Sequence, residues 1–255
     1  MTRSDLAKTF LNSGADYDRF RPGFPAEVAS YCLPERVHDA LDLGAGTGKF
    51  TEQLASRAEH LTAVDPSALM LAQLSRKLPS VTVLEGTAES LPLRDASQDA
   101  VTVAQAFHWF DRDAASREIA RVLRPGGTLA LVWNSPDPSC TWDSECQLVA
   151  HPDQGALTPE DVDAAPELDP LPGFDEMRSA WIPWSEHISR DHYLRRWLTV
   201  STFMAATDDE RREMLARLER ILDESPDTAG QTTLSLQHLT MALVYRKAAE
   251  ARRAA

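Results

Sequence analysis

The residues with the clearest chemical potential lie in a glycine-rich run that a second carboxylate follows. The run Leu41–Lys49 is LDLGAGTGK, with Asp42 two residues before Gly44 and further glycines at 46 and 48. Glycine allows a positive φ and lets a ligand approach more closely than a Cβ would permit. Asp65 comes 21 residues after Gly44. At the end of the next strand, such a carboxylate can accept hydrogen bonds from both hydroxyls of a ribose.

Other interpretations of these residues compete. A dinucleotide fingerprint requires its third glycine at position 49, where this chain has Lys49. This weakens the alternative of an NAD-dependent oxidoreductase. A phosphate-binding P-loop is disfavoured as well, because Phe50 stands where that motif requires Ser or Thr. Asp65 begins an Asp-Pro-Ser sequence, which is also a good start for a helix, so a capping role for Asp65 stays open.

These residues need a scaffold that brings strand ends together, and alternating strand and helix patterns predict one. Nearly continuous apolar runs favour strands that are buried on both faces, as in a parallel sheet. Such alternation predicts an open, doubly wound α/β sheet with its ligand beyond the carboxyl ends of the strands. We expect strands at 38–43, 60–65, 81–86, 99–107 and 128–134, and helices at 47–57, 67–77 and 113–123.

The chain after residue 134 has a different composition. Residues 135–189 hold one basic residue against twelve acidic ones and eight of the sixteen prolines. We expect three segments: 1–134 as an N-terminal cover and the ligand-binding core, 135–189 as an acidic lid with strand six, and 190–255 as helices and a last strand completing the same sheet. Within them we expect a loop-rich cover with one short helix over 135–169, a strand at 178–188, helices at 191–200 and 208–222, and a strand at 233–246. Pro183 places the strand at 178–188 on an edge or at a bulge.

Two further motifs narrow the interpretation. The run at 104–110 is AQAFHWF, and Leu123–Gly127 is LRPGG. Together with the Asp42–Gly48 run, they make the chain resemble the class I S-adenosylmethionine-dependent methyltransferases. The resemblance is to the small-molecule branch related to ubiquinone-biosynthesis and trans-aconitate methyltransferases, which carries the methyltransferase type 11 domain. It implies a Rossmann-like, seven-stranded, mostly parallel sheet with an antiparallel last strand beside the fifth and a lid inserted after strand five.

The same resemblance implies an activity and a cofactor site. A methyl group would pass from S-adenosylmethionine to a small molecule of specialised metabolism by in-line displacement, leaving S-adenosylhomocysteine. In the family, Asp65 would hold the ribose, Gln105 would lie beside the methionine part, Tyr17 over the sulfonium, and Arg21 on the methionine carboxylate. The implied cofactor-binding residues are Tyr17, Arg21, Asp42, Gly44, Ala45, Gly46, Gly48, Asp65, Pro66, Thr87, Ala88, Glu89 and Gln105. Tyr17 and Arg21 as mere anchors of an N-terminal helix, and Glu89 as a plain surface residue, stay open.

His108 is the candidate general base, because it stands just past the fourth strand, where the methyl group should point. A structural histidine packed between Phe107 and Trp109 is the alternative. Four more histidines are weaker candidates, and a carboxylate acceptor would need no base. The tryptophans concentrated after residue 132 suit either core packing or an aromatic acceptor pocket. No spacing of residues indicates a metal site.

Composition excludes several classes of partner. The net charge of −13 argues against nucleic acid, which clustered Lys and Arg bind. No apolar run approaches the roughly 18 residues that a membrane span needs, and the first residues lack the apolar core of a secretory signal. We therefore expect a cytoplasmic protein. The acceptor and the oligomeric state stay open, as does the alternative of a protein that binds S-adenosylmethionine without methylating. If acidic side chains of 135–189 turn inward, they would favour a cationic acceptor over an acidic one.

Overall fold

A computed structural model describes residues 20–152, 157–163, 166 and 170–248. Within these residues one sheet has the strand order β3-β2-β1-β4-β5-β7-β6. Strands β1 to β5 pair in parallel, whereas β7 runs antiparallel to both of its neighbours. The expected sheet, with an antiparallel last strand beside the fifth, is confirmed. The bounds are β1 Val37–Leu43, β2 Ala58–Asp65, β3 Thr82–Glu85, β4 Gln98–Ala104, β5 Leu123–Pro136, β6 Phe174–Ser189 and β7 Thr233–Lys247.

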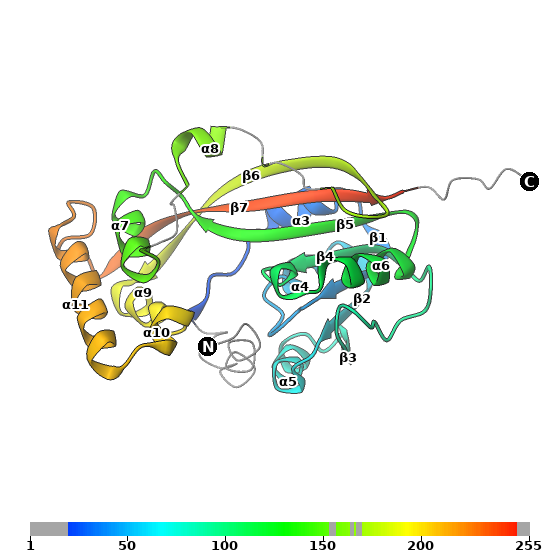
Figure 1. Cartoon of the computed structure of the whole chain (residues 1–255), viewed down its shortest axis with the longest axis horizontal. Coiled ribbons are helices and arrows are strands. Elements are labelled where there is room, and N and C mark those ends of the chain that lie inside the picture. Colours follow the sequence, from blue (N-terminus) through cyan, green and yellow to red (C-terminus); the bar gives the residue numbers. More distant parts are fainter. Residues whose placement is uncertain (1–19, 153–156, 164–165, 167–169, 249–255) are drawn as a thin grey trace, which may run out of the picture.

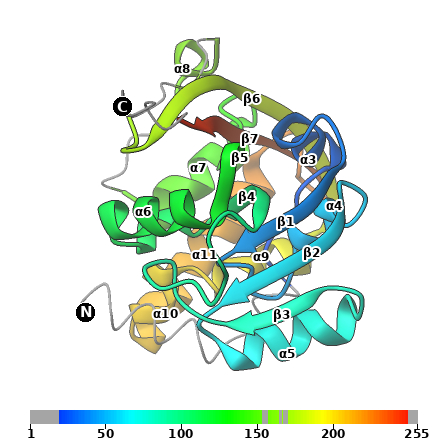
Figure 2. The same ribbon diagram turned by 90° about the vertical axis from the view of Figure 1, so that its right-hand side faces the viewer.

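Helices cover both faces of the parallel strands. Helices α3, α4 and α5 lie on one face and α6 lies on the other (Figure 2). Apolar residues of each group share a buried core with the strands they cover. The bounds are α3 Ala26–Cys32, α4 Thr51–Leu54, α5 Ala68–Lys77, α6 Arg112–Val122, α7 Thr141–Ala150, α8 Pro159–Asp163, α9 Arg190–Trp197, α10 Ser201–Ala205 and α11 Asp208–Glu224. Local sequence sets several starts: the Ser67 hydroxyl accepts from the N–H of Met70, and Asp111 accepts from that of Ala114.

Three of the differences between the structure and the sequence-based prediction have a clear physical reason. The helix expected over 47–57 is the single turn α4, because Gly46 and Gly48 hold the preceding residues in a turn with positive φ. The strand expected to reach residue 107 ends at Ala104, where Gln105 has a φ of +55° and a 3₁₀ turn follows. The described part of 135–169 contains two helices, α7 and α8, where one was expected, since α7 has an apolar face that packs on distant residues.

The last three strands are much longer than the others. β5, β6 and β7 have 14, 16 and 15 residues, so each spans about 50 Å at roughly 3.3 Å per residue. They extend past the parallel core to a second group of helices, α7, α9, α10 and α11 (Figure 1). A separate cluster of buried apolar side chains from α7, α9, α10, α11, β6 and β7 stabilises this distal end. The boundary expected at 134 falls inside β5, and the one at 189 coincides with the end of β6.

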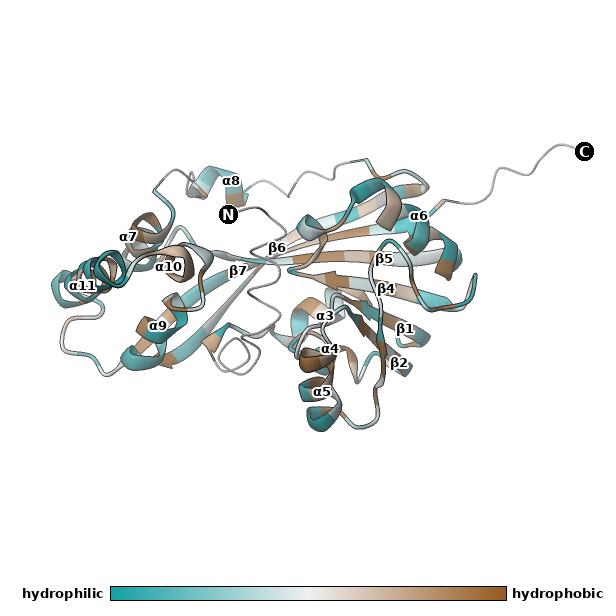
Figure 3. Ribbon diagram, turned by 60° about the horizontal axis from the view of Figure 1, so that its bottom comes forward, coloured by the Kyte–Doolittle hydropathy of each residue, from teal (hydrophilic) through white to brown (hydrophobic). Residues whose placement is uncertain are grey.

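Pro183 lies in β6, which is an edge strand as expected. Figure 3 shows apolar residues along the central strands and a largely hydrophilic α11. In the part of the chain that the structure describes, none of the helices combines the length and apolar character that crossing a membrane requires.

Candidate functional site

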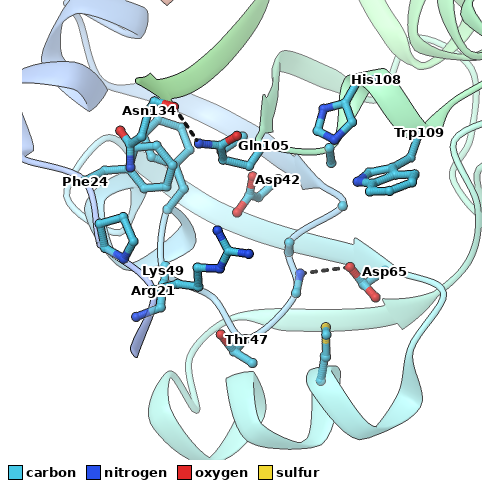
Figure 4. A pocket seen from close by; sticks show the side chains of 18 of the residues that line it. Arg21, Phe24, Asp42, Thr47, Lys49, Asp65, Gln105, His108, Trp109 and Asn134 are labelled. Atoms are coloured by element: carbon cyan, nitrogen blue, oxygen red, sulfur yellow. Dashed lines mark hydrogen bonds between the residues drawn. The ribbon is translucent and has the colours of Figure 1, made fainter. Parts of the chain in front are cut away.

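A cavity of about 490 Å³ lies at the carboxyl ends of β1, β2, β4 and β5 (Figure 4). This volume is within the range of small-molecule sites, roughly 300–1,000 Å³. Nine of the residues predicted from sequence line it: Arg21, Asp42, Gly44, Ala45, Gly46, Asp65, Pro66, Gln105 and His108. The cavity therefore gathers residues from four strand ends and from the N-terminal segment.

The three glycines of the loop after β1 have positive φ, but their surroundings differ. The φ angles of Gly44, Gly46 and Gly48 are +71°, +54° and +86°. A Cβ at Gly44 would lie 2.5 Å from the Cβ of Ala106, and one at Gly48 would lie 2.8 Å from Cγ of Leu74. Gly44 therefore permits contact with the loop after β4. Gly48 permits packing on α5 and does not line the cavity.

Asp65 holds the glycine loop in place and faces the cavity. Its Oδ2 accepts from the N–H of Gly46 at 2.9 Å, and its Oδ1 accepts from the N–H of Ser67 at 2.8 Å. The Ser67 hydroxyl caps α5, so Asp65 itself is not the N-cap. Burial raises the pKa of Asp65, while the two N–H groups oppose that rise. Each carboxylate oxygen keeps a second lone pair with which it can accept a bond from a ligand.

Asp42 is a carboxylate buried at the end of β1, with 1% of its surface exposed. Its two oxygens accept from the hydroxyls of Thr51 at 2.6 Å and Thr102 at 3.1 Å. Burial raises the pKa of Asp42 to about 6, against the effect of these hydrogen bonds, and the charge of Asp65 adds to the rise. Among the described residues no Lys, Arg or His pairs with Asp42 or Asp65. The cavity floor is therefore suited to a cationic ligand.

Gln105 and Asn134 connect three segments at the top of the cavity. Gln105 adopts a left-handed backbone, which is uncommon for a residue with a side chain and is often found at functional sites. Its Nε2 donates to the carbonyl of Asn134 at 3.2 Å. Asn134 in turn donates to the carbonyl of Gly23 at 2.9 Å and accepts from the Thr240 hydroxyl at 2.7 Å. The N-terminal segment is thus fixed to β5 and β7.

His108 lies beside two tryptophans at the cavity wall. The Nε1–H of Trp133 donates to Nδ1 of His108 at 3.3 Å, and the His108 ring is 4.9 Å from the ring of Trp109. An indole nitrogen can only donate, so Nδ1 carries no proton. We infer that the neutral His108 ring has its proton on Nε2. Its one available lone pair is then already occupied by Trp133.

Four predicted residues do not line the cavity: Gly48, Thr87, Ala88 and Glu89. Glu89 is exposed and accepts from the N–H of Asp111 at 3.0 Å, so it connects the turn after β3 to the start of α6. Tyr17 lies outside the described residues. Sequence reasoning missed many of the lining residues, among them Phe24, Thr47, Lys49, Phe50, Met70, Asn134, Val200 and Ser201. Asn134 had a usable signal, since it lies at the carboxyl end of the fifth strand.

Comparisons with known proteins agree with this geometry. The family model described as a methyltransferase domain matches residues 41–131. An uncharacterized methyltransferase of Mycobacterium tuberculosis is 36% identical over 241 residues, which cover 94% of this chain and 96% of the relative. The chain belongs to the methyltransferase family. A ubiquinone/menaquinone biosynthesis C-methyltransferase of Rubrivivax gelatinosus is 41% identical over 106 residues, 40% of this chain and 42% of that protein.

A solved structure supports the fold over nearly the whole chain. It comes from Anaeromyxobacter dehalogenans and is described as a type II methyltransferase, with a TM-score of 0.68 and 28% identity. The match covers 91% of this chain and 100% of that one. This methyltransferase therefore uses S-adenosylmethionine, the cofactor of its domain family, in a reaction of class EC 2.1.1.-. The cavity fits a cationic sulfonium because Asp42 and Asp65 are buried without a cationic partner among the described residues.

Proposed function

We propose that this methyltransferase modifies a small molecule that is held against the cofactor in the cavity at the strand ends. One observation carries the proposal: the cavity of about 490 Å³ adjoins a second one of about 140 Å³, and the two share six lining residues. The combined space accommodates a cofactor and a small acceptor. A concave site of this size also favours a small molecule over a folded macromolecule as acceptor.

The proposed cofactor contacts follow the strand ends. Asp65 would accept from the ribose hydroxyls with the lone pairs that Gly46 and Ser67 leave available. Gln105 would lie beside the methionine part. Arg21 would bind the methionine carboxylate, with one of its terminal nitrogens already donating to the carbonyl of Thr199 at 2.8 Å. Asp42 would contribute negative potential beneath the cationic centre.

The chemistry requires placement more than acid–base catalysis. When bound, S-adenosylmethionine supplies an electrophilic methyl group on a positively charged sulfur. The chain's contribution is to hold the acceptor in line with that group and to exclude water. His108 would act as base only for an acceptor that keeps its proton near neutral pH. The tautomer inferred above limits this role, because Trp133 must first release Nδ1.

Isotope transfer tests the proposal. The full chain would be incubated with S-adenosylmethionine carrying a ¹³C methyl group and with a cell extract separated into small-molecule and macromolecular fractions. We expect the label in a compound of the small-molecule fraction, together with S-adenosylhomocysteine. Label that enters only protein or nucleic acid would contradict the proposal.

The contact proposed for Asp65 has its own test. Asp65→Ala should weaken binding of S-adenosylhomocysteine by about 1–3 kcal/mol in calorimetry, since hydroxyl partners and the Gly46 N–H lose their acceptor. The control is Asp175→Ala, which removes an exposed carboxylate from β6. Unchanged affinity in Asp65→Ala would refute its role in the site.

A further inference from the structure

A group of side chains that commonly bind metal ions lies at the amino ends of β1 and β2. His38 and Asp39 belong to β1, and His60 belongs to β2. The two strands pair in parallel, and Asp39 stands opposite His60 in their register. The cofactor cavity lies at the carboxyl ends of the same strands, and none of the three residues lines it. The group is therefore separate from the cofactor site.

The three side chains are close enough to share one ion. One ligand atom of each, a ring nitrogen or a carboxylate oxygen, lies within 4.8 Å of the other two. Nδ1 of His38 is 3.0 Å from Oδ2 of Asp39, and the ring centroids of His38 and His60 are 4.7 Å apart. Zinc binds such atoms at about 2.0–2.2 Å, which places two ligands roughly 3–3.6 Å apart. His38 and Asp39 already have this separation, and the third ligand has to approach by about 1 Å.

An ion can reach this group from solvent. The side chains of His38 and Asp39 are 60% and 22% exposed, and His60 is exposed as well. Exposed side chains can change rotamer to complete the coordination of an ion. The three cysteines, which could also bind zinc as thiolates, are buried. The histidine group is therefore the more accessible place for zinc to bind.

Asp39 is held in a fixed orientation by Arg124. Nη2 of Arg124 donates to Oδ2 of Asp39 at 2.7 Å, and Nη1 donates to Oδ1 of Asp99 at 2.6 Å. Oδ2 of Asp99 accepts from the N–H of Asp39 at 2.9 Å. Hydrogen bonds of this kind orient the carboxylate ligands of metal sites and support metal affinity. Oδ1 of Asp39 has no hydrogen-bond donor among the described residues, so that oxygen is available to an ion.

The charges around His38 favour a cation. Three carboxylates act on its ring, those of Asp39, Glu59 and Asp99. The hydrogen bond to Asp39 and these negative charges raise the pKa of His38. Arg124 offsets one of the three negative charges, which leaves a net negative environment. A divalent ion would replace the proton that lies between His38 and Asp39 and would be attracted by the same charges.

We propose that His38, Asp39 and His60 bind one divalent transition-metal ion, with zinc as the ion that fits best. Two imidazoles and a carboxylate are a donor set that zinc prefers, and water would complete the coordination. The ion would join the amino ends of the two strands that carry Asp42 and Asp65 at their other ends, so its role is structural. The ligands lie on two strands, and only the register of these strands brings them together.

Calorimetry tests the site directly. The full chain, freed of any affinity tag, is titrated with zinc chloride at pH 7.5, and we expect one ion per chain. His60→Gln should weaken zinc binding about tenfold or more, because the loss of a group that only orients a ligand already costs roughly 10–100-fold. His187→Gln is the matched control, since His187 is an exposed histidine of β6 outside the group. It should bind zinc like the native chain.

A second measurement does not depend on a variant that folds. In the NMR spectrum of the native chain, the ring-proton signals of His38 and His60 should shift together when zinc is added, and those of His187 should not. Unmoved signals, or full zinc affinity in His60→Gln, would contradict the proposed site. Asp39→Asn keeps the shape of the side chain and should also weaken binding. Unchanged affinity in that variant would contradict the role of the carboxylate.

Two further titrations check the kind of ion and its place. Magnesium should bind far more weakly than zinc, because it prefers oxygen ligands, and equal affinity would contradict a site built on imidazoles. The affinity for S-adenosylhomocysteine should be the same with and without zinc. Competition between the two would place the ion at Asp42 and Asp65 and would contradict the proposed site. The proposed methyl acceptor has no part in these measurements, so they test the metal site by itself.

Discussion

The carboxylates of the cofactor site and Glu186 at the distal end differ in their partners. At the cofactor end, the described residues that donate to Asp42 and Asp65 do so only through hydroxyls and backbone N–H groups. At the distal end, Glu186 is paired with both Arg196 and His238. Burial raises the pKa of Asp42 and Asp65. Burial acts in the same direction on Glu186, but its hydrogen bond to His238 and the charge of Arg196 outweigh it and lower the pKa.

The presence or absence of a charged partner indicates whether a carboxylate serves ligand binding or the stability of the fold. A buried carboxylate without a counter-ion destabilises the fold, and a protein keeps such a group mainly where a ligand will meet it. The paired carboxylate of the distal end needs no ligand and holds α9 against β6 and β7. The comparison therefore predicts that changes at the cofactor end weaken ligand binding, whereas changes to the Glu186 pair affect folding and leave ligand binding unchanged.

The largest effect should come from the glycine loop. Gly44→Ala combines a strained φ with a Cβ placed 2.5 Å from that of Ala106, which should destabilise the fold by about 2–5 kcal/mol. We expect affinity for S-adenosylhomocysteine to fall about 30-fold or more, measured by calorimetry. Gly126→Ala is the matched control, because its φ is +74° but no atom lies within 4 Å of the added Cβ. It should lose only about 1–2 kcal/mol of stability and bind normally. If the two variants lost the same affinity for S-adenosylhomocysteine, backbone strain would explain the loss and the contact with Ala106 would not.

The glycine loop and its carboxylates could be predicted because short sequence patterns mark them. Asp42, Gly44 and Asp65 lie at strand ends that the apolar pattern marks, and a parallel sheet brings such ends to one edge. The short helix α4 and the early end of β4 were not predictable in the same way. Both depend on positive φ angles at particular residues, which contacts across the fold determine.

The last strands and the distal end were much less predictable, because bonds there join residues far apart in the chain. Asn134 bonds Gly23 and Thr240, which are 111 and 106 positions away. That the buried Nε1–H of Trp197 has no hydrogen-bond acceptor among the described residues follows only from the three-dimensional structure. The sequence indicated the edge position of β6 through Pro183, but it gave no evidence of the second cavity, which Asp143 lines.

The next largest effect is a dependence of the free energy of unfolding on pH, which we attribute to Asp42. Because its folded pKa of about 6 exceeds the ordinary value of 3.8, the native state binds more protons than the unfolded state between these values. Its contribution to stability is thus fully present at low pH and falls by about 3 kcal/mol as the pH rises through 6. Asp42→Asn should remove this slope and raise stability at pH 7, as measured by urea unfolding at pH 4.5 and pH 7. Binding of S-adenosylmethionine should weaken, since the negative charge beneath it is lost. A variant with the slope of the native protein would contradict the assignment.

Glu186→Gln tests whether the ionised carboxylate at the distal end stabilises the fold. It should lower stability at pH 7 by about 2 kcal/mol, because Arg196 and His238 lose a charged partner. Since the pKa of Glu186 is lowered, its contribution is present above the ordinary value of 4.5 and is lost as the pH falls below it. The native protein and the variant should therefore converge in stability near pH 3. Affinity for S-adenosylhomocysteine should not change. A fall in affinity comparable to that of Asp65→Ala would show that the Glu186 pair also contributes to ligand binding.

The smallest expected effect is on kcat, and it concerns the hydrogen bond between Trp133 and His108. Trp133 belongs to the long strand β5, and its indole occupies Nδ1 of His108. If His108 serves as the base, releasing that bond costs about 1 kcal/mol in every turnover. Trp133→Phe should then raise kcat up to about fivefold for an acceptor with a dissociable proton, with KM and cofactor affinity unchanged. A lower kcat would instead mean that Trp133 positions His108, and an unchanged one would mean that the reaction needs no base. Steady-state rates with the acceptor identified by labelling distinguish these results, and His108→Gln supplies the reference for a site without the base.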